Sequence, residues 1–306
     1  METTVIKPQS PLYAVVTGAN KGIGLTVRHL AQRGVSVVLA ARDPALGVAA
    51  AESLRRDFGL ENVVSHQLDV RDPSSVETLA RFVEGRFGKL DILVNNAGAS
   101  GLVVDEEKLR DLNIDPQVWL SGQAVDIIQE CVKQTYDGGV TCIDTNYYGC
   151  KRVIEALLPL LKLSSSGARI VNVSSLRSEL KRIPGEKIRN ELNDIENLNE
   201  DRIENLLKRF LEDLKEGKLE SGGWSMMLPS YSISKQVLNA YTRVLAKRYP
   251  KMYINCVHPG FVKTDINWNT GVITPEEGAQ GPVMLALLPD GGPSGCYFDQ
   301  TNKAEF

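Results

Sequence analysis

The chain has 306 residues, 42% of them hydrophobic and 24% charged, with a formal net charge of −3 at pH 7. This length can bury a sizeable core. The weak negative charge offers no basic field for nucleic acid or for an anionic membrane surface, and no stretch reaches the roughly 18 apolar residues of a membrane span. Residues 1–10 lack the apolar run of a signal peptide, so we expect a cytoplasmic location.

The cysteines predict neither a disulfide framework nor a zinc site. They show no CxxC spacing, and only three histidines accompany them. We therefore expect reduced, buried thiols and no bound metal. The five cysteines are Cys131, Cys142, Cys150, Cys256 and Cys296.

A short apolar run at 12–16 leads into a glycine-rich turn and then a helix-like segment at 25–31. Glycines between a strand and a helix let the backbone approach a pyrophosphate and direct amides at it. The spacing Gly-x-x-x-Gly-x-Gly differs from the commoner Gly-x-Gly-x-x-Gly, and plain tight packing is the alternative. We expect cofactor contacts in this turn from Gly18, Asn20, Lys21, Gly22, Ile23 and Gly24.

A second predicted strand, 35–41, ends at Arg42 and Asp43. At this place in a parallel dinucleotide fold, an acid binds the ribose hydroxyls of NAD, whereas an arginine accommodates the 2′-phosphate of NADP. Arg42 comes first, and Lys21 could add a second positive charge. Two cations and one acid favour NADP, although both cations could also be solvated surface charges.

Helices and strands continue to alternate along the chain. We expect helices at 49–58 and 74–87 and strands at 63–70 and 90–94. This pattern predicts right-handed βαβ units and a parallel sheet, whose ligands lie at the carboxyl ends of the strands. The residues expected there, near the adenine and its ribose, are Asp69, Val70, Asn95, Ala97 and Gly98, although Asn-Asn-Ala-Gly is also an ordinary turn.

The pattern lapses over 99–140, which is long and polar. An apolar-periodic segment follows at 141–161, and within it Asn146 is a poor helix former. The next predicted strand, 168–173, ends in Ser174 and Ser175. A serine at this position is well placed to meet a ligand, although serine also commonly ends strands.

The alternation of strands and helices lapses a second time over 177–225. It is densely charged, and leucines and isoleucines recur at helical spacing over 203–214, which predicts an amphipathic helix with a solvated charged face. Trp224, Met226 and Met227 follow just before the next helical segment. Such a cluster is either core or an apolar substrate wall.

Tyr231 and Lys235 stand four residues apart at the start of a helical segment, so their side chains share a face. A lysine ammonium beside a phenol favours the phenolate, and we expect the pKa of Tyr231 to fall from about 10 toward working pH. This pair could act as a general acid/base. The alternative is a half-buried core tyrosine beside a solvated lysine.

The last third predicts a strand at 252–258, a turn at 259–265, a helix beginning near 274 and a short strand at 295–298. No linker interrupts the chain, so we expect a single domain over 1–306.

Several motifs occur together in a fixed order over residues 12–300, and together they resemble the short-chain dehydrogenase/reductase family. Tyr231 follows Ser175 by 56 positions, a long spacing that resembles the monomeric carbonyl reductases. With the extra segment after Gly98, the chain is most similar to the plant menthone reductase and salutaridine reductase subgroup. The motifs are Thr17-Gly18-x-x-x-Gly22-x-Gly24, Asn95-Asn96-Ala97-Gly98, Asn146, Ser175, Tyr231-x-x-x-Lys235 and Pro259-Gly260-x-x-x-Thr264.

The resemblance implies a role for each motif. Tyr231 donates a proton to the carbonyl oxygen. Lys235 lowers the pKa of Tyr231 and binds the nicotinamide ribose. Ser175 hydrogen-bonds the substrate oxygen, with Ser174 as the alternative. Asn146 holds a water that links Lys235 to solvent. Thr264 and the backbone near Val262 fix the nicotinamide amide, and Pro259 and Gly260 also bind the cofactor.

The resemblance also implies a Rossmann-type doubly wound parallel sheet and NADPH-dependent reduction of a hydrophobic, cyclic ketone. The insertions 99–140 and 177–225 would form a lid, and the second would cover the helix face through which other members dimerise, so we expect a monomer. Close relatives that reduce an enone carbon–carbon bond carry an acid in place of the tyrosine, which leaves an ene-reductase as one alternative. A non-catalytic nucleotide-binding sensor or scaffold is the other.

Overall fold

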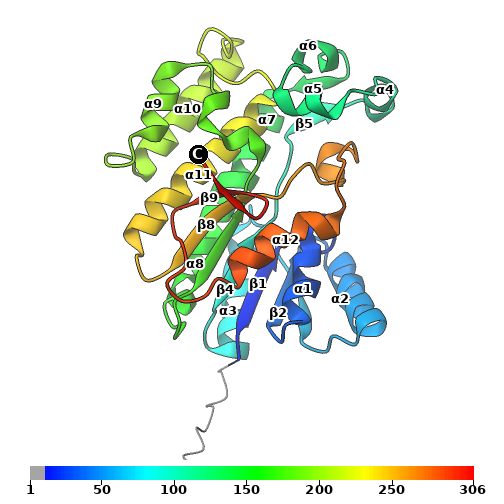
Figure 1. The fold of residues 1–306 in the computed structure, drawn as a ribbon, viewed down its shortest axis with the longest axis vertical. Helices are drawn as coiled ribbons and strands as arrows, with labels where there is room; N and C mark the ends of the chain where they lie inside the picture. The colour runs from blue at the N-terminus through cyan, green and yellow to red at the C-terminus, as the bar shows by residue number, and fades with distance from the viewer. Residues whose placement is uncertain (1–10) are drawn as a thin grey trace, which may run out of the picture.

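The structure, a computed structural model, describes residues 11–306 and contains one eight-stranded sheet in the order β10-β9-β8-β7-β4-β1-β2-β3. All neighbouring strands are parallel except β9 and β10 (Figure 1). The predicted doubly wound parallel sheet is confirmed. The strands are β1 (Tyr13–Thr17), β2 (Ser36–Ala41), β3 (Val63–Gln67), β4 (Ile92–Asn95), β7 (Arg169–Val173), β8 (Tyr253–His258), β9 (Tyr297–Asp299) and β10 (Asn302–Ala304).

Helices cover both faces of the sheet, because alternate side chains of each buried strand point to opposite faces. Val15 and Leu93 belong to one apolar core, and Val16 and Val94 belong to the other. Within residues 11–306 no helix combines the length and apolar character needed to cross a membrane. The first core is covered by α3 (Pro73–Phe87), α8 (Cys150–Leu161) and α11 (Pro229–Arg248), and the second by α1 (Thr26–Ala31), α2 (Pro44–Phe58) and α12 (Pro275–Ala286).

Two helices begin at an aspartate followed by proline. The side chain of Asp43 accepts hydrogen bonds from Ala45 N and Leu46 N, and that of Asp72 accepts one from Ser74 N. Each aspartate satisfies amide groups that the first helical turn leaves unpaired, and proline is tolerated there because it lacks one. This cap explains why α2 begins at Pro44, five residues before the predicted start at 49.

The first insertion forms a small subassembly around its own apolar cluster, which we call the third core. It contains β5 (Leu102–Val104), α4 (Glu106–Asp111), α5 (Pro116–Ser121), α6 (Val125–Ile128) and β6 (Val132–Gln134), and β5 pairs with β6 antiparallel. In Figure 1 these elements lie at the end of the sheet where β1 finishes. The third core consists of Leu109, Trp119, Ala124, Ile128, Cys131, Met227 and Trp268.

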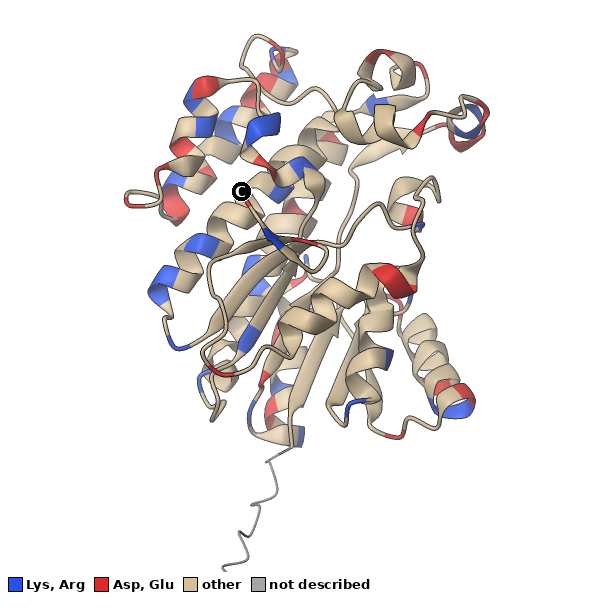
Figure 2. Cartoon of the chain, viewed as in Figure 1, with Lys and Arg blue, Asp and Glu red and all other residues tan. Residues whose placement is uncertain are grey.

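The second insertion packs on the body of the protein. Its helices α9 (Glu186–Asn193) and α10 (Glu200–Glu216) contact α11, and α10 also contacts α7 (Tyr136–Ile143). Ile203, Leu207 and Phe210 of α10 are buried in the first core, as the amphipathic pattern predicts. In Figure 2 acidic and basic residues alternate along both helices, and most of these residues are exposed or half-buried. The charged face is therefore solvated.

Candidate active site

A cavity of about 520 Å³ lies where β1, β2, β3, β4, β7 and β8 end, a size typical of small-molecule sites. It collects most of the predicted site residues, although they are spread over the chain from 18 to 264. Those lining it are Gly18, Asn20, Lys21, Gly22, Ile23, Arg42, Asp69, Val70, Ala97, Gly98, Ser174, Ser175, Tyr231, Lys235, Pro259, Gly260, Val262 and Thr264.

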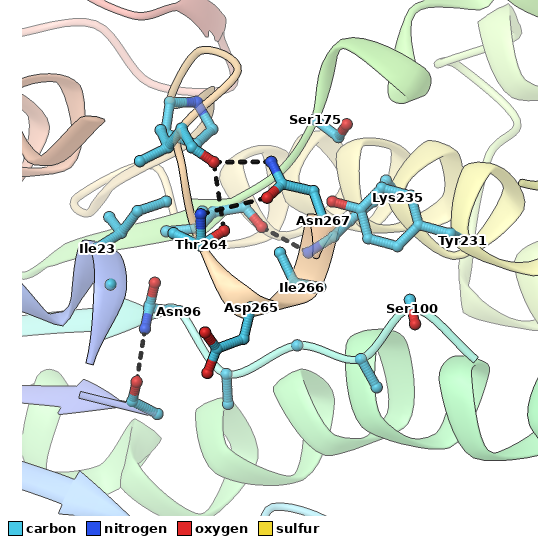
Figure 3. Close-up of a pocket in the computed structure, with 18 of the residues that line it drawn as sticks. Ile23, Asn96, Ser100, Ser175, Tyr231, Lys235, Thr264, Asp265, Ile266 and Asn267 are labelled. Atoms are coloured by element: carbon cyan, nitrogen blue, oxygen red, sulfur yellow. Dashed lines mark hydrogen bonds between the residues drawn. The ribbon is translucent and has the colours of Figure 1, made fainter. Parts of the chain in front are cut away.

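Tyr231 and Lys235 lie one turn apart on α11, as Figure 3 shows, with the Lys235 ammonium 5.8 Å from the centre of the Tyr231 ring. The ammonium donates to the carbonyl oxygen of Val173 at 2.8 Å. Ser175 is close enough to Tyr231 to lower the pKa of its phenol, whereas the Ser174 hydroxyl donates to Asn239 Oδ1 at 2.6 Å. Ser175 is therefore the serine that the structure brings to the phenol.

Burial dominates the ionisation of both residues. Removal from water raises the pKa of Tyr231 to about 12, although Ser175 and the positive charge of Arg177 act in the opposite direction. The same effect lowers the pKa of Lys235 to about 8, and the ammonium lies in a buried position. The expected fall in the pKa of Tyr231 is therefore wrong for the protein alone, because desolvation outweighs nearby positive charge.

Asn146 lies in a π-helical turn, Asp144–Gly149, between α7 and α8. Its amide nitrogen donates to Ala99 O and to Ser234 Oγ, each at 2.9 Å, and its amide oxygen accepts from Ala99 N at 2.8 Å. Asn146 thus joins the turn after β4 to α11 and does not line the cavity. The periodic segment 141–161 gave no sign of this wider turn, a feature often found at functional sites.

The glycine turn fits the phosphates of a dinucleotide. Gly18 has a φ of +61°, and a side-chain Cβ there would lie 2.8 Å from the Cα of Ala97. The turn continues into a short 3₁₀ helix, Gly22–Leu25, and then α1, so the first turn of this helix, whose amides lack partners within it, begins at the cavity lining. Gly24 has a different place, since it packs on Ala19 behind the cavity lining.

The two residues after β2, Arg42 and Asp43, have different contacts. The Asp43 carboxylate is used as the cap of α2, whereas Arg42 lines the cavity and pairs with no carboxylate in the described part of the chain. Lys21 forms an exposed ion pair with Asp265 at 2.5 Å, which joins the glycine turn to the loop after β8. The hydrogen bonds of Asp43 therefore compete with any contact to ribose.

Asn95 is buried behind the cavity, where its amide donates to Asn172 Oδ1 at 2.9 Å. Its neighbour Asn96 lines the cavity instead and donates to the carbonyl oxygens of Thr17 and Gly18 at 2.9 and 3.0 Å. Strand alternation turns adjacent side chains to opposite directions at this point. Asn96 could have been chosen from the same Asn-Asn-Ala-Gly run.

The predicted substrate wall before α11 does not reach this cavity. Trp224 packs edge-on against Phe210 at 5.2 Å and donates to Asp213 Oδ2 at 2.7 Å. Met226 and Met227 line a separate cavity of about 450 Å³, and Met227 also belongs to the third core. These residues follow the second insertion, whose helices cover α11. Of that insertion, only Arg177 reaches the main cavity, so the two insertions do not share the role of a lid.

Aromatic residues that the sequence reasoning missed form the wall instead. Trp119 of α5 stacks on Phe261 with ring centres 6.2 Å apart and meets Trp268 edge-on at 6.5 Å. Leu228 and Trp268 line the same wall in left-handed conformations, with φ of 53° and 54°. Such conformations are uncommon for large side chains and cluster at functional sites. The one available signal was Trp119, the single tryptophan of the polar stretch 99–140.

Comparisons with known proteins agree with this geometry. A family model described as short chain dehydrogenase matches residues 12–186. Short-chain dehydrogenase/reductase 1 of Saponaria officinalis is 50% identical over 297 residues, 96% of each chain. (+)-Neomenthol dehydrogenase of Arabidopsis thaliana is 47% identical over 303 residues, 97% of this chain and 99% of the relative. The solved structure of salutaridine reductase from Papaver somniferum has a TM-score of 0.87 at 44% identity, covering 94% of this chain and 99% of that one. The chain belongs to the short-chain dehydrogenase/reductase family of oxidoreductases.

Proposed function

We propose that this protein uses NADPH to reduce a hydrophobic, cyclic ketone of the terpenoid or alkaloid type to the secondary alcohol. The observation that carries this is the position of Tyr231 and Ser175 beside an aromatic wall in the main cavity. Two proton or hydrogen-bond donors suit a carbonyl oxygen, and the wall suits an apolar ring. The names of the relatives, neomenthol dehydrogenase and salutaridine reductase, support the same substrate class.

In this proposal the nicotinamide, when bound, supplies a hydride to the carbonyl carbon. Tyr231 donates its hydroxyl proton to the carbonyl oxygen, and Ser175 donates a hydrogen bond that stabilises the developing alkoxide. A pKa of about 12 keeps Tyr231 protonated at neutral pH, as an acid requires. Lys235 would bind the nicotinamide ribose hydroxyls, and Asn146, which reaches Ser234 on the same helix, would hold this part of α11 in place.

NADPH is favoured over NADH because Arg42 pairs with no carboxylate among residues 11–306, whereas Asp43 is occupied as a helix cap. Arg42 would bind the 2′-phosphate, joined by Lys21 if its pair with Asp265 opens. The pyrophosphate would lie on the glycine turn, and the adenine beside Asp69 and Val70. The other residues proposed to hold the cofactor are Asn96, Ala97, Gly98, Pro259, Gly260, Val262 and Thr264.

The proposed function is tested by NADPH consumption with product identification over lipophilic cyclic ketones and enones. Secondary alcohols are expected. A saturated ketone formed from an enone would replace this proposal with the ene-reductase. NADPH binding without turnover of any compound would favour the non-catalytic sensor or scaffold.

The substrate wall gives a paired prediction. Trp119→Leu should raise KM for the ketone roughly tenfold, since it loses about 1–2 kcal/mol of apolar contact. Trp224→Phe, in contrast, should leave KM unchanged and lower the free energy of unfolding by about 1–2 kcal/mol, since it removes the hydrogen bond to Asp213. Steady-state kinetics and urea unfolding measure the two effects. A raised KM in Trp224→Phe would mean that Trp224 contacts the substrate, as the sequence predicted.

We also propose that the protein is a monomer. Helices α9 and α10 pack on α11 with Ile203, Leu207 and Phe210 buried between them, which leaves that face of α11 covered. Light scattering at low concentration should give the mass of one chain, 33.6 kDa. A dimer mass would contradict the proposal.

A cytoplasmic location completes the proposal. All five cysteines are free thiols, and four of them are buried. Such thiols suit a reducing compartment. Fractionation of cells that express the tagged protein would test the location.

A further inference from the structure

Arg177 connects the three elements that surround the site. Its backbone amide donates to Ser175 Oγ at 3.2 Å. Its carbonyl oxygen accepts from the side chain of Gln236, next to Lys235 on α11, at 3.2 Å. Its guanidinium Nη2 donates to the carbonyl oxygen of Trp119 on α5. One residue thus links the serine, the helix of the phenol and the aromatic wall.

The end of α5 is held by two arginines. Arg177 binds the Trp119 carbonyl, and Arg182 Nη1 donates to the Leu120 carbonyl at 2.8 Å. The last carbonyls of a helix lack partners within it and carry partial negative charge, so cations are favourable there. Because Trp119 and Leu120 both line the cavity, these two contacts fix the position of its wall.

The two arginines differ in their electrostatic surroundings. Arg182 forms an ion pair with Glu179 at 2.9 Å. Arg177 is only 7% exposed, yet no carboxylate of the described residues lies within ion-pair distance of it. A buried guanidinium without a counter-ion is costly to maintain. Arg177 lines the same cavity as Tyr231, and the phenolate of Tyr231 would supply a counter-ion for the guanidinium.

On the basis of the proposed reductase function, we propose that Arg177 is a positioning residue, which holds α5 at the cavity and stabilises the ionised form of Tyr231 with its charge. The other titratable groups near the phenol are Cys142 of α7 and Lys235 of α11. Burial raises the pKa of Cys142 to about 12, so its thiol is neutral. Burial lowers the pKa of Lys235 to about 8 and that of Arg177 to about 10. Arg177 therefore keeps its positive charge to a higher pH than Lys235 does.

The charge is tested by the pH profile of alcohol oxidation with NADP⁺, in which Tyr231 must accept a proton as phenolate. Removing a nearby cation raises the pKa of a phenol, so the rising limb of kcat/KM in Arg177→Met should move up by about one pH unit. Arg177→Lys retains a charge and should restore most of the shift. Arg182→Met is the matched control, since it removes a contact to the same helix end. The rising limb of its kcat/KM profile should lie at the same pH as that of the wild type. The electrostatic role would be overturned if kcat/KM rose at the same pH in Arg177→Met and the wild type. It would also be overturned if Arg182→Met moved the rising limb as far as Arg177→Met does.

The contact to α5 is tested without turnover, by amide hydrogen exchange over 116–128. Both Arg177→Met and Arg182→Met should speed exchange there, because each removes a partner of the helix end. Unchanged exchange in Arg177→Met would overturn the positioning of α5. If the wild type itself turned over no ketone or alcohol, the proposed function would fail, and the exchange result would still decide whether Arg177 holds α5.

Discussion

Tyr231→Phe should lower kcat for ketone reduction roughly 10³-fold, the scale of a lost general acid. Phenylalanine retains the ring beside Lys235 and removes only the hydroxyl, whose pKa Ser175 helps to lower. The substitution leaves the glycine turn and Arg42 intact, so the Kd for NADPH should stay nearly unchanged. Single-turnover kinetics and NADPH fluorescence titration measure the two quantities.

Tyr241→Phe provides the matched control for this result. Tyr241 is buried on the same helix, and it belongs to the first core rather than the cavity lining. Its hydroxyl should be dispensable for turnover. Retained activity in Tyr231→Phe would remove Tyr231 from the role of acid, whereas loss in both variants would indicate damage to α11.

Arg42→Asp should change the ratio of kcat/KM for NADPH to that for NADH by roughly hundredfold in favour of NADH. A hydrogen bond to a charged group contributes about 1.5–3 kcal/mol, and the new carboxylate would repel the 2′-phosphate. The substitution leaves Asp43 on the amides of α2, so the start of this helix should be preserved.

Arg33→Asp gives the same change in net charge at an exposed position before β2, at the opposite end of the strand from Arg42. Its cofactor ratio should match the wild type. An unchanged ratio in Arg42→Asp would mean that another group, with Lys21 as the first candidate, binds the 2′-phosphate.

The sequence predicted the parts of the protein that depend on local order. The apolar runs that became β1 and β2 were found within a residue or two, because buried parallel strands are continuous apolar segments. The shared face of Tyr231 and Lys235 followed from helix geometry alone.

Features that depend on long-range packing could not be predicted in the same way. Whether Trp224 or Trp119 faces the cavity is decided by which insertion packs on α11, and the two indoles look alike in the sequence. The direction of the pKa shift of Tyr231 depends on burial, which the spacing to Lys235 does not report. The role of Asp43 depended on its contact with the amides of α2, although the Asp-Pro pair marked the helix start.

The separation of the third core from the two cores that flank the sheet bears on how substitutions affect stability. Trp119 and Trp268 belong to the third core, whereas the residues that hold the sheet together belong to the other two. Substitutions in groups without shared contacts act nearly additively on stability. Substitutions among the buried side chains of the third core are therefore expected to leave the stability of the sheet and its covering helices nearly unchanged, apart from the contact of Arg177 with Trp119.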